Sequence, residues 1–138
     1  MAVGFKVKFY WYQIGMGDFL HAFFSTVCYN LENSKWGSRY PFIMNELYSG
    51  ELKRENVETA LVELNEIKSE LEKISVDKVI WDIDNLSLQA PWGDDISQNI
   101  TSLGNYFVTS DGDDFITVFN NALEKAKKLN TSIKIESL

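Results

Sequence analysis

The chain has 138 residues, of which 45% are hydrophobic and 14% aromatic, and its 13 basic and 20 acidic side chains give a formal net charge of −7. This length predicts one domain, residues 1–138, with a core large enough to fold without disulfides or structural metals. The acidic balance argues against nucleic acid and anionic membranes as partners, because both require a basic surface. One cysteine, Cys28, excludes an internal disulfide and fits a reducing compartment.

Localisation and metal content can be addressed in the same way. No apolar run approaches the ~18 residues of a membrane span, and MAVGFKVKFYWY at the start alternates instead of forming the apolar core of a signal peptide. We therefore expect a cytoplasmic protein. With one His and one Cys in the chain, none of the usual zinc sites can be built, and we expect neither a metal nor a cofactor.

The first half predicts a strand, a helix and an irregular strand. Apolar residues alternate with other residues through the first strand, at Val3, Phe5, Val7, Phe9 and Trp11. Asp18 is the expected N-cap of a helix, whose apolar stripe consists of Phe19, Leu20, Phe23, Phe24, Val27 and Leu31. After a loop at 33–38, residues 39–48 are expected to form a strand that is irregular at Pro41.

The second half predicts two further helices. The clearest helical pattern covers 54–74, and 79–81 reads as a short apolar strand. Residues 84–104 are expected to be a loop with a short helix near 95–103, followed by a strand at 106–108. A third helix is expected after Asp111–Asp114, through Leu129, and a closing strand at Ile133 and Ile135. Such alternation predicts an α+β or layered α/β domain with a mixed sheet of four or five strands and three main helices.

Charge is distributed unevenly along the chain. No Lys, Arg or His occurs between Lys78 and Lys125, an interval that holds seven aspartates: Asp82, Asp84, Asp94, Asp95, Asp111, Asp113 and Asp114. The other acids number 20 − 7 = 13, equal to the 13 bases, so these aspartates match the whole net charge. Such a segment fits a cationic protein partner; solubility alone is the other explanation.

Two motifs near the first helix fail as chemical sites. Gly15-Met16-Gly17 resembles a phosphate loop, but Leu20 stands where the dinucleotide fingerprint has its third glycine, and Asp18 would repel an anion. His21 and Cys28 lie seven residues apart, about 10 Å along a helix axis, too far for a nucleophile and its base. We expect a buried structural cysteine and a His21 that interacts with Asp18.

The segment VIWDIDN contains the strongest catalytic motif, Asp82-x-Asp84 at the end of an apolar run. Haloacid-dehalogenase-type phosphatases present a nucleophile and an acid this way, but Asn85 and Leu86 replace their glycine and hydroxyl residue. As a calcium loop the segment also fails, because the sixth position is Ser87 and the twelfth is Gly93. A Mg²⁺-dependent phosphohydrolase remains an alternative, beside solvated acids at a strand end.

Two acidic turns complete the candidates. Asp111-Gly112-Asp113-Asp114 fits a turn followed by a capped helix better than a metal cluster. In PWGDD, Pro91 and Gly93 predict a turn, and Trp92 is either a docking anchor or a lid on the core. Both can hold if the ring folds back while the adjacent aspartates stay outside.

Read together, FYWYQIGMGDFLHAFF, PFIMNELYSGEL, VIWDID, PWGDDI and NYFVTSDG resemble the Immunity protein 70 family of bacterial polymorphic toxin systems. The resemblance extends over nearly the whole chain and includes no catalytic signature. It implies a small cytosolic antidote that binds and blocks a toxin encoded beside it.

From the charge pattern we expect the toxin to be basic, for example a nuclease, and to be contacted by the acidic segment. The residues assigned to this contact are Asp82, Asp84, Trp92, Asp94, Asp95, Asp111, Asp113 and Asp114. An acidic adaptor unrelated to toxins is the remaining alternative.

Overall fold

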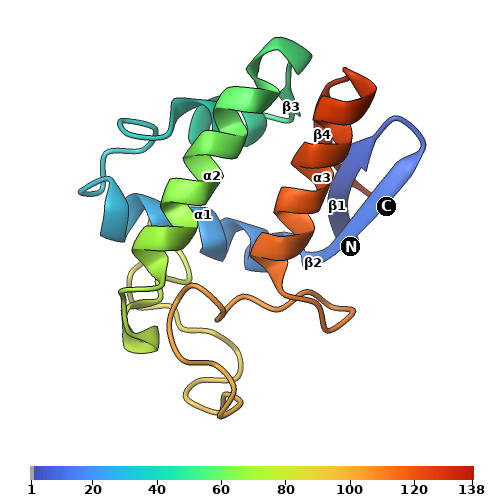
Figure 1. Ribbon diagram of the computed structural model, residues 1–138. Helices are drawn as coiled ribbons and strands as arrows, with labels where there is room; N and C mark the ends of the chain where they lie inside the picture. Colours follow the sequence, from blue (N-terminus) through green and yellow to red (C-terminus); the bar gives the residue numbers. More distant parts are fainter. Residues whose placement is uncertain (1) are drawn as a thin grey trace.

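A computed structural model describes residues 2–138, which form one four-stranded sheet and three long helices (Figure 1). The helices are α1 (Gly17–Leu31), α2 (Val57–Leu71) and α3 (Phe115–Leu129), with short helical turns η1 (Phe42–Leu47), η2 (Arg54–Asn56) and η3 (Val76–Lys78). The strands are β1 (Ala2–Val7), β2 (Tyr10–Met16), β3 (Glu51–Leu52) and β4 (Ile133–Ser137). The expected α+β class with three main helices is confirmed.

The sheet has the order β2-β1-β4-β3 and is antiparallel at every pairing. The mixed sheet that the alternation of strands and helices suggested is therefore not what forms. The single strand predicted through Val3–Trp11 is also wrong, because the chain reverses between Val7 and Tyr10, where Lys8 has a φ of 53°. Phe9, which fits the alternation, lies at this turn and is 95% exposed.

The core lies between the helices and the sheet. Helices α2 and α3 lie side by side, and α3 packs on β1 (Figure 1). Aromatic rings fill this space, with Phe5 and Phe119 at a centroid distance of 4.7 Å and Phe23 and Phe115 at the same distance. Within residues 2–138, no helix is long and apolar enough to cross a bilayer.

The helix predictions differ in their outcome at the N-termini. Helix α3 begins as predicted, because the Asp114 carboxylate accepts a hydrogen bond from Thr117 N at 3.0 Å. Asp18, in contrast, lies in the first turn of α1, and the N-cap position belongs to Met16, whose side chain makes no cap bond. Helix α2 is confirmed, though it starts three residues later than expected, after η2.

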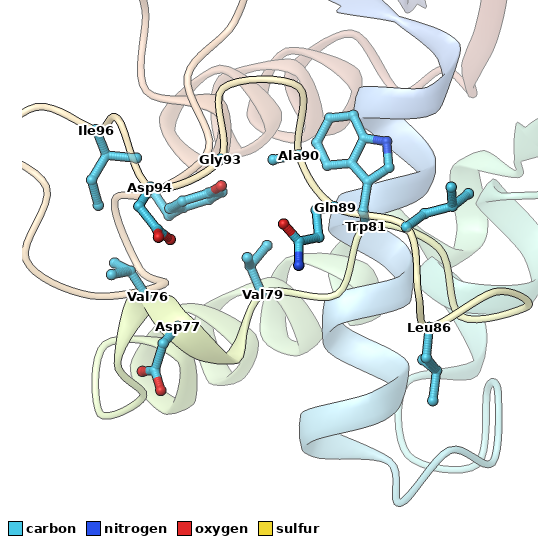
Figure 2. A pocket seen from close by; sticks show the side chains of 12 residues that line it. Val76, Asp77, Val79, Trp81, Leu86, Gln89, Ala90, Gly93, Asp94 and Ile96 are labelled. Carbon is cyan, nitrogen blue, oxygen red and sulfur yellow. The ribbon is translucent and has the colours of Figure 1, made fainter.

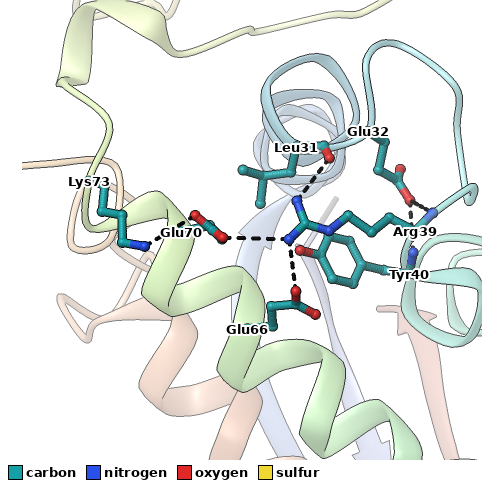
Figure 3. Close-up of polar contacts among 7 residues, drawn as sticks. All are labelled: Leu31, Glu32, Arg39, Tyr40, Glu66, Glu70 and Lys73. Carbon is teal, nitrogen blue, oxygen red and sulfur yellow. Dashed lines mark hydrogen bonds and ion pairs between the residues drawn. The ribbon is translucent and has the colours of Figure 1, made fainter.

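Residues 39–48 were predicted as a strand, but residues 42–47 form the π-helix η1. Two buried acids explain the difference. Glu63 accepts hydrogen bonds from the backbone N–H groups of Phe42 and Ile43, at the start of η1. Glu32 accepts three such bonds, from Gly37, Arg39 and Tyr40, and Figure 3 shows those from Arg39 and Tyr40. A carboxylate at the C-terminal end of α1 and one in α2 thus take the place of strand partners.

The connection is further held by Arg39, whose guanidinium contacts Glu66 and Glu70 of α2 at 2.7 and 3.5 Å (Figure 3). The same side chain donates to the Leu31 carbonyl at the end of α1. All three charged groups are partly exposed, so each pair contributes little on its own. Their main effect is to fix the relative positions of α1 and α2, because the Arg39 side chain contacts both helices.

Residues 79–114 form an irregular segment, which we call the acidic loop, at one end of the molecule (Figure 1). The predicted strands at 79–81 and 106–108 and the predicted helix at 95–103 do not form; one isolated bridge joins Val108 to Asp114. The loop expected over 84–104 is confirmed. Strand pairing is replaced at 78–83 by hydrogen bonds from side chains of α1.

Three small polar residues of α1 make those bonds. Thr26 Oγ1 accepts from Ile80 N and donates to Ile80 O, at 3.0 and 3.1 Å. Ser25 Oγ accepts from Ile83 N, and Asn30 Nδ2 donates to the Lys78 carbonyl. The backbone of the segment, which a strand would have paired in a sheet, is satisfied in this way.

Candidate functional site

The acidic loop borders a groove of about 410 Å³ (Figure 2). One side comes from residues 76–81 and the other from residues 86–96, and Tyr106 also lines it. Most of its lining side chains are apolar or aromatic, polar and apolar atoms share its exposed surface about equally, and its two charged members, Asp77 and Asp94, are both acidic. The groove therefore combines apolar side chains with negative charge and carries no cation among its lining residues.

Trp92 sits beside this groove in a fixed position. Its indole Nε1–H donates to Tyr106 Oη at 2.8 Å, and its ring meets the Trp81 ring edge-to-face at a centroid distance of 5.4 Å. Trp92 is nevertheless 40% exposed. The ring folds back onto the aromatic side chains and still presents part of its surface, so the anchor and the lid interpretations both remain compatible with its position.

The turn that carries Trp92 keeps its aspartates outside. Gly93 adopts a φ of 58° and donates its N–H to the Ala90 carbonyl at 2.9 Å. A side chain is disfavoured at this φ, which explains the glycine. Asp94 and Asp95 follow directly and are exposed.

Asp82 and Asp84 lie against α1 rather than at the end of a strand. Asp82 Oδ1 is 3.2 Å from His21 Nε2 and accepts the backbone N–H of Asp84 at 2.9 Å. The other ring nitrogen of His21, Nδ1, is 2.5 Å from the hydroxyl of Tyr48. His21 thus pairs with residues far along the chain, and not with Asp18 as the sequence suggested.

Cys28 is 1% exposed, which confirms the prediction of a buried structural cysteine. Burial raises the pKa of its thiol to about 11, and the negative charges of Glu32 and Asp84 act in the same direction. A thiol with so high a pKa is not an activated nucleophile. The Cys28–His21 pair therefore has no catalytic geometry or chemistry.

The remaining aspartates lie elsewhere. Asp111, Asp113 and Asp114 border a second, open hollow together with Trp11 and Gln13 of β2. Asp114 caps α3, as the turn-and-cap interpretation predicted. Within residues 2–138, the group of acidic, His or Cys side chains close enough to share an ion is His21, Asp82 and Asp84. The seven aspartates thus lie in three separate regions: beside His21, in the turn that carries Trp92, and just before α3.

Sequence reasoning missed the residues that position this region. The sequence predicted Tyr48 and Tyr106 as strand residues and Ser25 and Thr26 as helix residues without a role. In the structure they hold His21, Trp92 and the start of the acidic loop. One available signal was the pair Thr26 and Asn30, polar residues four apart beside the apolar stripe of α1, which share one helix face.

Comparison with known protein families shows which family the chain belongs to. The family model of Immunity protein 70 matches residues 5–135, from β1 to β4. No curated protein and no solved structure matches the chain. The match includes the three long helices and the whole acidic loop. The chain belongs to the Immunity protein 70 family.

Proposed function

We propose that the chain neutralises its cognate toxin by placing the acidic loop on a basic active or substrate-binding site of that toxin. Membership of the family makes the chain an immunity protein against a toxin. The proposal adds the surface, the charge of the partner and the mode of inhibition. A toxin that acts on nucleic acid fits best, because its site must attract phosphate.

One observation carries this proposal: a fixed, half-exposed Trp92 beside a groove lined mostly by apolar side chains, whose charged members are all carboxylates. Tryptophan is enriched among interface residues with large binding energies, and such anchors lie in apolar surroundings. No Lys, Arg or His occurs from 79 to 124 to weaken the negative field. Apolar contact and charge are thereby presented on one surface.

Charge complementarity also serves the kinetics that an antidote requires. Oppositely charged surfaces raise association rates by roughly 10- to 1,000-fold at low salt. Because an unbound toxin acts on the cell that makes it, fast capture matters as much as tight binding. The exposed Asp94 and Asp95 are placed to act in this way.

Charge reversal tests the surface directly. We expect Asp94→Lys with Asp95→Lys to lower the association rate with the toxin encoded beside this gene by about tenfold or more at low salt, and to flatten its salt dependence. A matched control reverses two exposed acids in β3 and η2, Glu51→Lys with Glu55→Lys. Unchanged kinetics in the first variant would refute this surface but not the immunity role.

The rival interpretation is a Mg²⁺-dependent phosphohydrolase that uses Asp82 and Asp84. Its one structural support is His21 beside the carboxylates. Turnover of a generic phosphomonoester with Mg²⁺, abolished by Asp82→Asn, would establish it; we expect no turnover. An adaptor unrelated to toxins would instead lack a toxin gene as its neighbour.

A further inference from the structure

Three side chains that are far apart in sequence meet where the acidic loop crosses α1. His21 comes from α1, and Asp82 and Asp84 come from the loop. One imidazole nitrogen and one oxygen of each carboxylate all lie within 4.8 Å of one another. Ligands at ~2.1 Å around a tetrahedral ion are about 3.4 Å apart, and His21 Nε2 and Asp82 Oδ1 already have this spacing at 3.2 Å.

The histidine is held from outside the group. Tyr48, which follows η1, contacts His21 Nδ1 at 2.5 Å, and the Trp36 ring stacks on the imidazole at 6.1 Å with an interplanar angle of 21°. Metal-binding histidines characteristically place their second nitrogen on such a partner, which fixes the ring and its tautomer. In the tautomer with Nδ1 protonated, Nδ1–H donates to Tyr48 and the Nε2 lone pair is available to an ion held by the carboxylates.

The charge of the group is compatible with a bound cation. Two carboxylates face one imidazole, and only Asp82 is paired with the histidine, while Asp84 is exposed to solvent. Among the residues that the structure describes, no side-chain donor or cation contacts the Asp84 carboxylate; its backbone N–H is used by Asp82. No Lys or Arg occurs between 79 and 124 to supply the missing charge.

We propose that His21, Asp82 and Asp84 bind a divalent first-row transition ion, with Zn²⁺ as the reference case, that fastens the acidic loop to α1. Imidazole favours this class of ion over Mg²⁺ and Ca²⁺, which prefer oxygen ligands throughout. Three protein ligands leave one coordination position for water. Counting His and Cys could not show this site, because two of its ligands are aspartates.

Metal binding can be measured on the isolated protein without any toxin. After removal of metals with a chelator, we expect titration calorimetry to show one saturable Zn²⁺ site per chain, with much weaker binding of Mg²⁺. Co²⁺ in place of Zn²⁺ should give the visible absorption bands of a bound ion. Asp84→Asn and His21→Gln should each abolish the saturable phase.

Two further variants separate a built site from surface binding. Tyr48→Phe removes the group that orients His21 and should weaken Zn²⁺ by about tenfold. Asp94→Asn with Asp95→Asn removes two exposed carboxylates of the same loop and should leave the affinity unchanged. Because Asp84 is exposed, Asp84→Asn should unfold at the wild-type temperature when chelator is present.

Either of two results overturns the proposal. One is the absence of saturable Zn²⁺ binding to the wild-type chain. The other is binding that survives in both Asp84→Asn and His21→Gln, or that falls equally in the Asp94 and Asp95 control. Neither result bears on whether the chain neutralises a toxin, since the site is proposed to brace the loop and not to recognise the partner.

Discussion

Among single residues, Tyr40 has a hydroxyl that is buried and, within residues 2–138, lacks a hydrogen-bond partner. Burial raises its pKa to about 12. A buried unsatisfied polar group lowers stability, so Tyr40→Phe should raise the free energy of unfolding by about 1 kcal/mol. Urea denaturation measures this change.

Tyr106→Phe is the matched control for that substitution. It removes the same atom, but here the hydroxyl accepts the Trp92 indole N–H. We expect the opposite sign, a loss of about 1 kcal/mol. A loss of stability in Tyr40→Phe as well would mean that the Tyr40 hydroxyl is satisfied in solution.

The thiol of Cys28 should be unreactive in the native protein. Its pKa of about 11 lies above the ordinary value of 9.0, so the unfolded chain loses this proton first and stability falls as the pH rises past 9. At pH 8 we expect iodoacetamide to modify Cys28 slowly in the folded chain and rapidly in denaturant, as followed by mass spectrometry. Equal rates in the two states would contradict the burial that the structure shows.

Glu63 should make the free energy of unfolding depend on pH in the acidic range. Burial raises the pKa of this carboxyl above its ordinary 4.5, although the N–H groups of Ile43 and Phe42 oppose the shift. Between 4.5 and the raised value the folded state binds more protons, so acidification through this window favours folding. Wild type should therefore gain stability relative to Glu63→Gln as the pH falls through it, measured by denaturation at each pH.

Among the three long helices, α3 is the one whose N-terminus is capped by a side chain, that of Asp114. The Asp114 carboxylate accepts from both the backbone N–H and the hydroxyl of Thr117, at 3.0 and 2.8 Å. Removal of an N-cap costs about 1 kcal/mol, and Asp114→Ala should lower the free energy of unfolding by that amount. Asp111→Ala removes an exposed aspartate of the same turn and should have little effect on the denaturation midpoint.

Elements with strong periodicity were predictable, and those held by tertiary polar contacts were not. Helices α2 and α3 follow from their apolar spacing, and β4 from Ile133 and Ile135. The segments at 39–48 and 79–81 contain strand-forming residues, yet Glu32, Glu63 and Thr26 capture their backbone groups. No local pattern shows which distant carboxylate or hydroxyl will take a given N–H.

For the whole molecule, the proposed docking surface predicts an unequal distribution of binding energy. Trp92→Ala should weaken toxin binding by about 30-fold or more, chiefly through faster dissociation, if the ring is an anchor. Phe9→Ala is the comparison, because Phe9 is 95% exposed and the β1–β2 hairpin turn that carries it lies away from the acidic loop (Figure 1). Comparable affinities of the two variants, measured by surface plasmon resonance, would count against Trp92 as the anchor.

The sequence identified the acidic segment but not its arrangement. The absence of cations from 79 to 124 is visible in the letters alone. The division of the aspartates among α1, the groove and the start of α3 depends on how the loop folds, and so do the meetings of His21 with Asp82 and of Trp92 with Tyr106. These pairs are 61 and 14 residues apart in sequence.

The bonds from Ser25, Thr26 and Asn30 to residues 78–83 all end on main-chain atoms of the loop. Main-chain atoms persist through almost any substitution, so these tethers place few demands on which side chains the tethered stretch carries. Under the proposed function, side chains of this stretch that hold no other group in place can therefore change with the toxin while the helix beneath keeps its bonds. These main-chain tethers would thus let a recognition surface vary without loss of the fold.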